Sequence, residues 1–202
     1  MHAPLPARGS AGLTAMAELV IDLAREADIP ELDRLISRSA SSLCSRYYDP
    51  DAIEAAIEHV FGVDTQLIRT RCYFVARVRE RIIGCGGWSP FATLFGADKA
   101  HGRNDTRLDP AVDDARIRAF FVSGDWTRVG VGSALLETCE SAAVAAGFGS
   151  TRLMATLSGA PFYAARGYVA IGDHVARFGE TDVRFVAMRK ALRLRQGNAR
   201  AA

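Results

Sequence analysis

Residues 116 to 147 read RIRAFFVSGDWTRVGVGSALLETCESAAVAAG. In the first seven residues, Ile117, Ala119 and Phe121 alternate with Arg118, Phe120 and Val122. This run of β-branched and aromatic side chains predicts a largely buried strand. From Val131 onward the apolar residues recur at helical spacing, and Gly147 stands where a helix would end in a left-handed residue. The stretch therefore predicts a strand, a tight glycine turn and a helix.

The glycine turn predicts an anion site. Gly130 and Gly132 carry no Cβ, so the backbone can come close to a ligand where the first helical turn leaves its amides unpaired. A helix N-terminus stabilises an anion by roughly 0.3–1 kcal/mol, and by up to about 2 kcal/mol when partly buried. Such a turn can seat a diphosphate, but most of the affinity for a nucleotide ligand must come from other contacts.

Three other interpretations of the turn compete with this one. It can be a simple glycine-rich connection. A Walker A loop is excluded because no Gly-Lys-Ser/Thr follows. A dinucleotide fingerprint needs a third glycine where the chain has Leu135, and a carboxylate after the next strand, where it has Ser158-Gly159-Ala160.

Two motifs carry a resemblance to a known family. Residues 127–136, TRVGVGSALL, resemble motif A of the GNAT superfamily of acyl-CoA-dependent N-acetyltransferases, with the pattern Gln/Arg-x-x-Gly-x-Gly/Ala. Residues 160–168, APFYAARGY, are similar to motif B, which reads Phe-Tyr-x-x-x-Gly-Phe/Tyr. The two occur in this order about thirty residues apart, with a strand between them. One departure is Thr127 in place of Gln or Arg, with the cation one position later at Arg128.

The pattern of elements along the chain agrees with the fold that this resemblance implies. That fold is mixed α/β, with a mostly antiparallel sheet of six to seven strands flanked by about four helices. Besides the central unit we expect strands at 18–25, 72–78, 81–88, 150–157, 168–177 and 183–192, and helices opening at 28 and 49 and spanning 159–166. The pair at 72–78 and 81–88 should form a hairpin.

The length of 202 residues suits one domain with a substantial core. We expect a mobile leader at 1–17, a single N-acetyltransferase domain at 18–192 and a loose tail at 193–202. The leader has no continuous apolar run of signal-peptide or membrane-span length. We therefore expect no membrane association.

Charge and cysteine content narrow the function classes. The formal net charge is +2 and no block of like charge marks a nucleic-acid surface, so we expect no nucleic-acid partner. The four cysteines, Cys44, Cys72, Cys85 and Cys139, lack C-x-x-C spacing and are interpreted as reduced core residues, which suits the cytoplasm. The four histidines form no pair at metal-ligand spacing, and we expect no metal.

The resemblance implies direct transfer of an acetyl group from acetyl-CoA, as co-substrate, to a primary amine. It assigns the cofactor site to Phe121, Val122, Arg128, Val129, Gly130, Val131, Gly132 and Ser133. The backbone N–H of Val122 would polarise the thioester carbonyl, as catalytic donors of this kind do. Tyr163 would donate to the departing thiolate. The alternative role for Tyr163 is a packing aromatic beside Phe162.

Several assignments stay open at this level. Ser41, Ser42, Arg46, Tyr47 and Tyr48 either line the acceptor pocket or form a polar loop between two helices. Residues 89–115 form a long loop, which we interpret as a flap or wall over the acceptor amine. Gly84, Gly86 and Gly87 indicate a bulge, a close approach to a ligand, or packing against a helix. His101, Asp113, Asp114, Glu80 or a water chain could serve as general base, and His59 is interpreted as structural or exposed.

The sequence thus predicts an acetyl-CoA-dependent N-acetyltransferase that acts on a small-molecule amine. The alternative is a non-catalytic acyl-CoA binding or sensing domain. A nucleotide-dependent oxidoreductase is disfavoured by Leu135 and the missing carboxylate. The sequence leaves a homodimer open and does not identify the acceptor.

Overall fold

The computed structural model of the protein describes residues 18–100 and 103–193. The predicted leader at 1–17, almost all of the predicted tail and the candidate base His101 lie outside the described residues.

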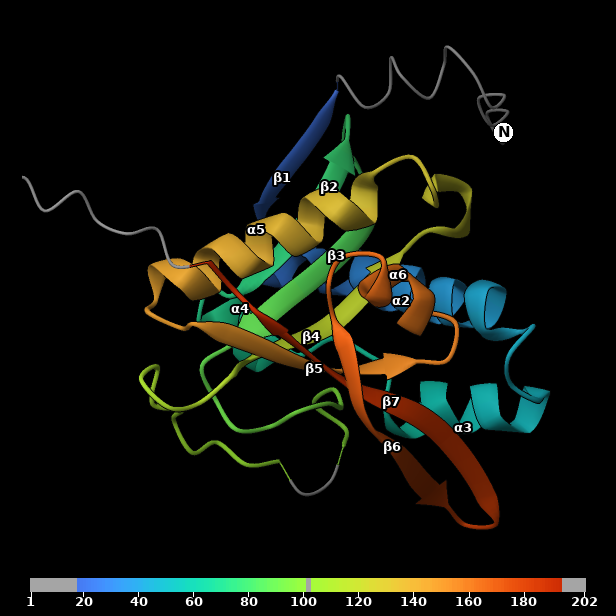
Figure 1. Cartoon of the computed structure of the whole chain (residues 1–202). Helices are drawn as coiled ribbons and strands as arrows, with labels where there is room; N and C mark the ends of the chain where they lie inside the picture. Colours follow the sequence, from blue (N-terminus) through green and yellow to red (C-terminus); the bar gives the residue numbers. More distant parts are fainter. Residues whose placement is uncertain (1–17, 101–102, 194–202) are drawn as a thin grey trace, which may run out of the picture.

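The fold is built on one seven-stranded sheet in the order β1-β2-β3-β4-β5-β7-β6 (Figure 1). Its strands are β1 (Leu19–Leu23), β2 (Tyr73–Val78), β3 (Arg81–Ser89), β4 (Ala115–Val122), β5 (Ser150–Thr156), β6 (Val169–Phe178) and β7 (Thr181–Ala191). Every neighbouring pair is antiparallel except β4 and β5, which run parallel. The predicted mixed, mostly antiparallel sheet is confirmed.

Five α-helices accompany the sheet in the described residues. They are α2 (Ile29–Cys44), α3 (Pro50–His59), α4 (Thr65–Arg69), α5 (Val131–Ala145) and α6 (Ala160–Ala164), with 3-10 turns η1 (Glu26–Asp28) and η2 (Gly124–Trp126). Helix α5 lies across one face of the sheet, and α2 and α3 lie behind it (Figure 1). Apolar side chains of α2 and of α5 are buried against the sheet, so the hydrophobic core forms on both sides of it.

The glycines of β3 mark close packing. A β-bulge interrupts the β3–β4 register between Cys85 and Gly87, which is one of the alternatives that the glycines left open. A Cβ on Gly84 would lie 3.1 Å from the Leu135 side chain in α5, and one on Gly87 would lie 2.9 Å from the Leu67 side chain in α4. These glycines therefore let helices approach the sheet from both faces, and their presence does not require a ligand.

Strand β4 is irregular where it leaves β5. Ala119 has φ 51°, a left-handed conformation that is unfavourable for a residue with a Cβ. Its carbonyl accepts a hydrogen bond from the buried Tyr73 hydroxyl at 3.1 Å. The parallel pairing with β5 covers only Ala115 to Ile117, although β5 continues to Thr156. The C-terminal halves of β4 and β5 therefore separate.

Two features of the helical layer differ from the sequence prediction. Ser41 and Ser42 lie within α2 rather than in a loop between helices. Their hydroxyls donate to the carbonyls of Ser37 at 3.0 Å and Ser39 at 3.2 Å, which satisfies these polar side chains without ending the helix. The short helix α4 was not predicted, although its N-cap Asp64 accepts from the amide of Leu67.

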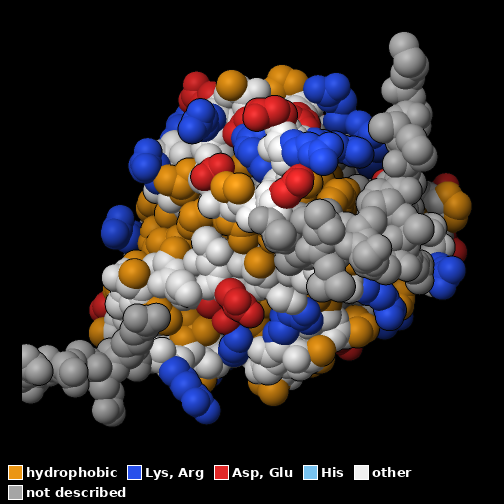
Figure 2. All heavy atoms as spheres, turned by 90° about the horizontal axis from the view of Figure 1, so that it is seen from above, with side chains coloured by type: hydrophobic (Ala, Val, Ile, Leu, Met, Phe, Trp, Pro, Cys, Tyr) orange, Lys and Arg blue, Asp and Glu red, His pale blue; other side chains and the backbone are white. Residues whose placement is uncertain are grey.

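The four cysteines are free thiols and all are buried, as predicted. The described part of the chain contains no helix that is long and apolar enough to cross a membrane. On the face in Figure 2, Lys and Arg side chains lie among acidic and apolar ones. This mixing agrees with a net charge close to zero.

Candidate active site

The first turn of α5 has free backbone donors. Gly130, the N-cap, has φ 102°, which favours glycine at this position. No hydrogen bond from the amides of Val131, Gly132 or Ser133 to another described residue is found, and no side chain caps the helix. These three amides, together with the positive end of the helix dipole, can receive an anion.

Helix α6 packs against this turn. A Cβ on Gly132 would lie 3.1 Å from the Phe162 ring and 3.7 Å from the Val122 side chain. Gly132 is therefore required for the packing of α6 on α5, whether or not a ligand also approaches it. The contact brings motif B residues to the opening between β4 and β5.

The amide of Val122 points toward that opening. Ser123 donates its backbone N–H to Ile83 at 2.9 Å, and Val122 lies opposite Gly84 in the antiparallel β3–β4 ladder. Successive residues direct their amides alternately toward and away from a partner strand, so the Val122 amide faces away from β3. Its carbonyl, on the same side, accepts from Ser39 Oγ at 2.8 Å. The N–H has no partner among the described residues.

Tyr163 lies in an aromatic cluster beside the same opening. Its side chain is only 7% exposed and makes edge contacts with Phe120, Phe162 and Tyr168 at centroid distances of 6.1, 5.0 and 5.5 Å. Burial raises the pKa of Tyr163, so the phenol stays protonated at neutral pH. Its hydroxyl makes no hydrogen bond to the described residues, which leaves a donor available there.

The remaining predicted cofactor residues lie at the edges of this site. The Phe121 ring faces the opposite side of the sheet and contacts Phe61 edge-on at 5.4 Å, so only its backbone borders the opening. Arg128 is exposed and has φ 63°. Val129 is exposed as well, next to the N-cap glycine. The sequence alone located the glycine turn. It did not indicate whether each residue borders the site with its backbone or with its side chain.

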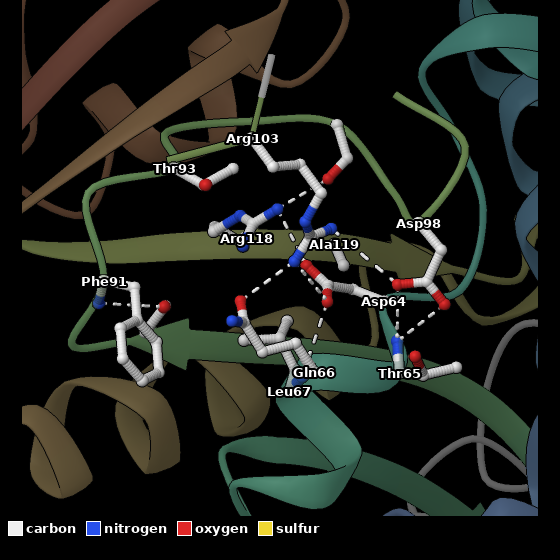
Figure 3. A network of polar contacts seen from close by, with 12 residues as sticks. Asp64, Thr65, Gln66, Leu67, Phe91, Thr93, Asp98, Arg103, Arg118 and Ala119 are labelled. Atoms are coloured by element: carbon white, nitrogen blue, oxygen red, sulfur yellow. Dashed lines mark hydrogen bonds and ion pairs between the residues drawn. The ribbon is translucent and has the colours of Figure 1, made fainter. Parts of the chain in front are cut away.

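A buried ion-pair network supports β4 on its other face (Figure 3). Asp64 is fully buried and pairs with Arg118 of β4 at 2.7 Å and with Arg103 at 3.1 Å. Arg118 also donates to the carbonyl of Gly96 at 2.5 Å. Burial lowers the pKa of Arg118, and the Asp64 carboxylate opposes this effect. The network fastens the 89–115 loop to β4, close to the Ala119 bulge.

Three candidate general bases, Asp113, Asp114 and Glu80, are engaged in other contacts or lie away from the opening between β4 and β5. The Asp114 carboxylate binds Arg189 at 2.9 Å and also accepts from Ser150. Asp113 accepts the amide of Asp109 at 2.8 Å. Both precede Ala115, at the opposite end of β4 from Val122, so they are poorly placed to accept a proton at the opening. Glu80 lies in the exposed turn between β2 and β3.

Two residues of the early helical region are structural. The Tyr48 hydroxyl donates to the carbonyl of Arg184 at 2.6 Å and accepts from the amide of Leu157 at 2.8 Å, so it ties the loop after α2 to β7 and to the end of β5. Burial raises the pKa of Tyr48 to about 12. His59 stacks on Phe178 at 4.9 Å, consistent with a structural role.

A pocket of about 440 Å³ opens on the face of the sheet that carries Phe121. It lies between α2, the segment at 61–65 and the loop at 97–99, and its lining includes Asp33, Phe61, Asp98 and Lys99. Phe61 contacts Phe121, the residue before Val122. The volume is in the range of small-molecule sites.

Comparisons with known proteins agree with this geometry. Residues 107–192 match the family model described as acetyltransferase (GNAT) domain. A search of curated protein sequences found no match. The fold is similar to that of a GCN5-related N-acetyltransferase from Rhodopseudomonas palustris, with a TM-score of 0.63 and 19% identity over 86% of this chain and 95% of that one.

Two further solved structures are similar. The PaiA N-acetyltransferase of Thermoplasma acidophilum in complex with coenzyme A has a TM-score of 0.57 at 16% identity, over 86% of this chain and 98% of that one. The ribosomal-protein-S18-alanine N-acetyltransferase of Escherichia coli has a TM-score of 0.56 at 14% identity, over 89% and 97%. Identities this low establish the fold and not the substrate.

The fold and the family match together define an acyltransferase. Residues 107–192 match the GNAT acetyltransferase model and the fold is similar to that of GNAT N-acetyltransferases, in agreement with the resemblance of the two sequence motifs.

Proposed function

We propose that this protein transfers an acetyl group from acetyl-CoA directly to the primary amine of a small molecule. The observation that carries the proposal is that three groups of donors, none with a partner among the described residues, meet around the opening between β4 and β5. They are the first-turn amides of α5, the amide of Val122 and the hydroxyl of Tyr163. Each suits one charge that acetyl transfer from a CoA thioester presents or develops.

Each group of donors would act on a different part of acetyl-CoA. The amides of Val131, Gly132 and Ser133 would hold the diphosphate of acetyl-CoA. This ligand would supply the acetyl group as a thioester. The amine would attack the thioester carbonyl, so that the new C–N bond forms and the C–S bond breaks. The N–H of Val122 would stabilise the negative charge that develops on the carbonyl oxygen, an effect of about 3 kcal/mol for one preorganised donor.

Tyr163 would act on the departing sulfur. Because burial raises its pKa, complete proton transfer from the phenol to a thiolate is strongly uphill. A hydrogen bond to the sulfur as its charge develops needs no such transfer, and the excess proton of the amine can reach the thiolate or solvent through water. We therefore assign Tyr163 as a hydrogen-bond donor that stabilises the leaving group.

The pocket beside Phe121 supports a small acceptor. Its volume of about 440 Å³ suits a small amine. The exposed carboxylate of Asp33 in its lining favours a cationic acceptor, whereas the Asp98 carboxylate already accepts the amide of Thr65 at 3.0 Å and lies 3.7 Å from Arg103. Residues 97–99 would then form the wall that we predicted for the 89–115 loop.

The proposal is tested by release of free thiol from acetyl-CoA over a panel of small amines, amino acids and peptides. We expect thiol release that depends on a small amine, with the acetylated amine found by mass spectrometry. Binding of acetyl-CoA without release on any acceptor would favour the non-catalytic domain. Release on peptides alone would refute the small-molecule acceptor.

Removing one pocket carboxylate should affect the acceptor alone. We expect Asp33→Asn to raise the KM for a cationic acceptor by about threefold to tenfold, because an exposed carboxylate contributes modestly to binding a cation. The KM for acetyl-CoA should not change. Steady-state kinetics with each substrate varied in turn measure both values, and Glu58→Gln on the exposed face of α3 is the matched control. Equal effects of the two substitutions would remove the pocket from the acceptor site.

A further inference from the structure

Arg166 brings a permanent positive charge to the N-terminus of α5. It follows α6, and its guanidinium lies over the Phe162 ring with Cζ 3.8 Å from the ring centroid. Nη1 donates to the carbonyl of Phe162 at 3.0 Å. Nε donates to Ser133 Oγ at 3.2 Å, and Nη2 donates to the same oxygen. The side chain is thus held in one orientation from three sides.

This position is electrostatically unfavourable by itself. A helix N-terminus carries partial positive charge, so it favours an anion and repels a cation. Arg166 forms no ion pair with any described carboxylate, whereas six other arginines do. A fixed cation beside three amides that have no partner in the described part of the chain indicates that a strong anion completes the site.

The contact also determines how Ser133 can act. A hydroxyl has two acceptor lone pairs and one proton. Since Arg166 donates twice to Ser133 Oγ, that proton is left to donate elsewhere, and it has no acceptor among the described residues. Arg166 likewise keeps two of its five N–H groups beyond those used by Ser133 and Phe162. The pair therefore presents donors only.

We propose that Arg166 is a phosphate-binding residue that also positions the Ser133 hydroxyl as a donor, and that both engage the diphosphate of coenzyme A. The inference depends on the proposed function, which supplies the phosphate ligand. Thr127 does not offer a comparable cation, since it has no charge and its hydroxyl donates to the carbonyl of Gly124 at 2.9 Å. Arg166 reaches the turn from α6 instead.

The test is calorimetric titration of coenzyme A, dephospho-coenzyme A and pantetheine into the full chain. Dephospho-coenzyme A lacks the 3′-phosphate. Pantetheine lacks both the 3′-phosphate and the diphosphate. We expect Arg166→Leu to weaken coenzyme A and dephospho-coenzyme A equally, by about tenfold or more, because charge-assisted hydrogen bonds to phosphate are lost. Pantetheine binding should not change. Arg177→Leu, on the distant and exposed β6–β7 hairpin, is the control and should have no effect.

Two further variants separate this role from simple packing. In a Ser133→Ala background, Arg166→Leu should cost less affinity than in the native chain, because the two residues act together. Arg166→Leu should also lower the thermal shift produced by coenzyme A while leaving the unliganded midpoint nearly unchanged. A fall in the unliganded midpoint with an unchanged shift would mean that the residue only packs, and would overturn the proposal.

The outcomes distinguish the inference from the proposed function. If the native chain fails to bind coenzyme A, the proposed function fails and takes the inference with it. If the native chain binds and Arg166→Leu binds equally well, only the inference is overturned. A loss seen with coenzyme A but not with dephospho-coenzyme A would overturn the assignment to the diphosphate.

Discussion

Tyr163→Phe should lower kcat by about 100-fold, while the affinity for acetyl-CoA stays nearly unchanged. The substitution removes one oxygen that makes no hydrogen bond to the described residues, so the aromatic cluster keeps its packing. The stabilisation of the leaving sulfur is lost only as charge develops, which affects turnover rather than binding. Steady-state thiol release and calorimetric titration measure the two quantities.

Tyr168→Phe provides the matched control for this prediction. Tyr168 is a buried neighbour of Tyr163, but its hydroxyl is hydrogen-bonded to Thr151 at 2.8 Å and to Glu140 at 3.0 Å. Its loss should reduce thermal stability and leave kcat nearly unaltered. If Tyr163→Phe instead behaves like Tyr168→Phe, with lower stability and normal turnover, Tyr163 is a packing residue.

Asp64→Asn should destabilise the protein by about 3–5 kcal/mol, because it leaves the buried Arg118 guanidinium without its counter-charge. For a domain of this size the expected fall in Tm is roughly 6–20 °C. The same change loosens the tie between β4 and the loop at Gly96. Circular dichroism melting measures the effect.

The control for Asp64→Asn is Asp98→Asn. Asp98 also faces Arg103, at 3.7 Å, but its side chain is 44% exposed, so we expect a loss below about 1 kcal/mol. Combining Asp64→Leu with Arg118→Met should recover part of the stability lost in Asp64→Asn, since it removes the two most buried charges together and leaves only Arg103, whose side chain is 18% exposed, without Asp64. Equal melting points for Asp64→Asn and the native chain would contradict the role given to this network.

The parts of the fold that sequence predicted correctly are those with local causes. The alternation in residues 116–122, the glycine turn and the helical spacing from Val131 each depend on neighbours within a few residues. Four buried cysteines were also anticipated from local pattern, and the bulge in β3 was one of three alternatives that its glycines left open. Sequence located α2 but ended it too early, because serine usually marks a cap or loop and here bonds back into its own helix.

The parts that sequence missed depend on tertiary register. No local pattern indicates that Ala119 adopts a left-handed conformation. The contact of Arg166 with Ser133 joins residues 33 positions apart in the chain. One signal was available: a charged residue such as Arg118 within a buried strand requires a buried partner, which the fold supplies as Asp64.

The central claim is that the uncapped amides of α5 bind the phosphates of coenzyme A beside the opening of β4 and β5. The most direct measurement is a coenzyme A titration followed by the backbone amide resonances of the isotope-labelled chain. We predict that the largest shifts occur at Val131, Gly132 and Ser133, with a second group at Val122. Saturable binding that leaves these four amides unshifted, while shifts concentrate at another part of the chain, would contradict the claim.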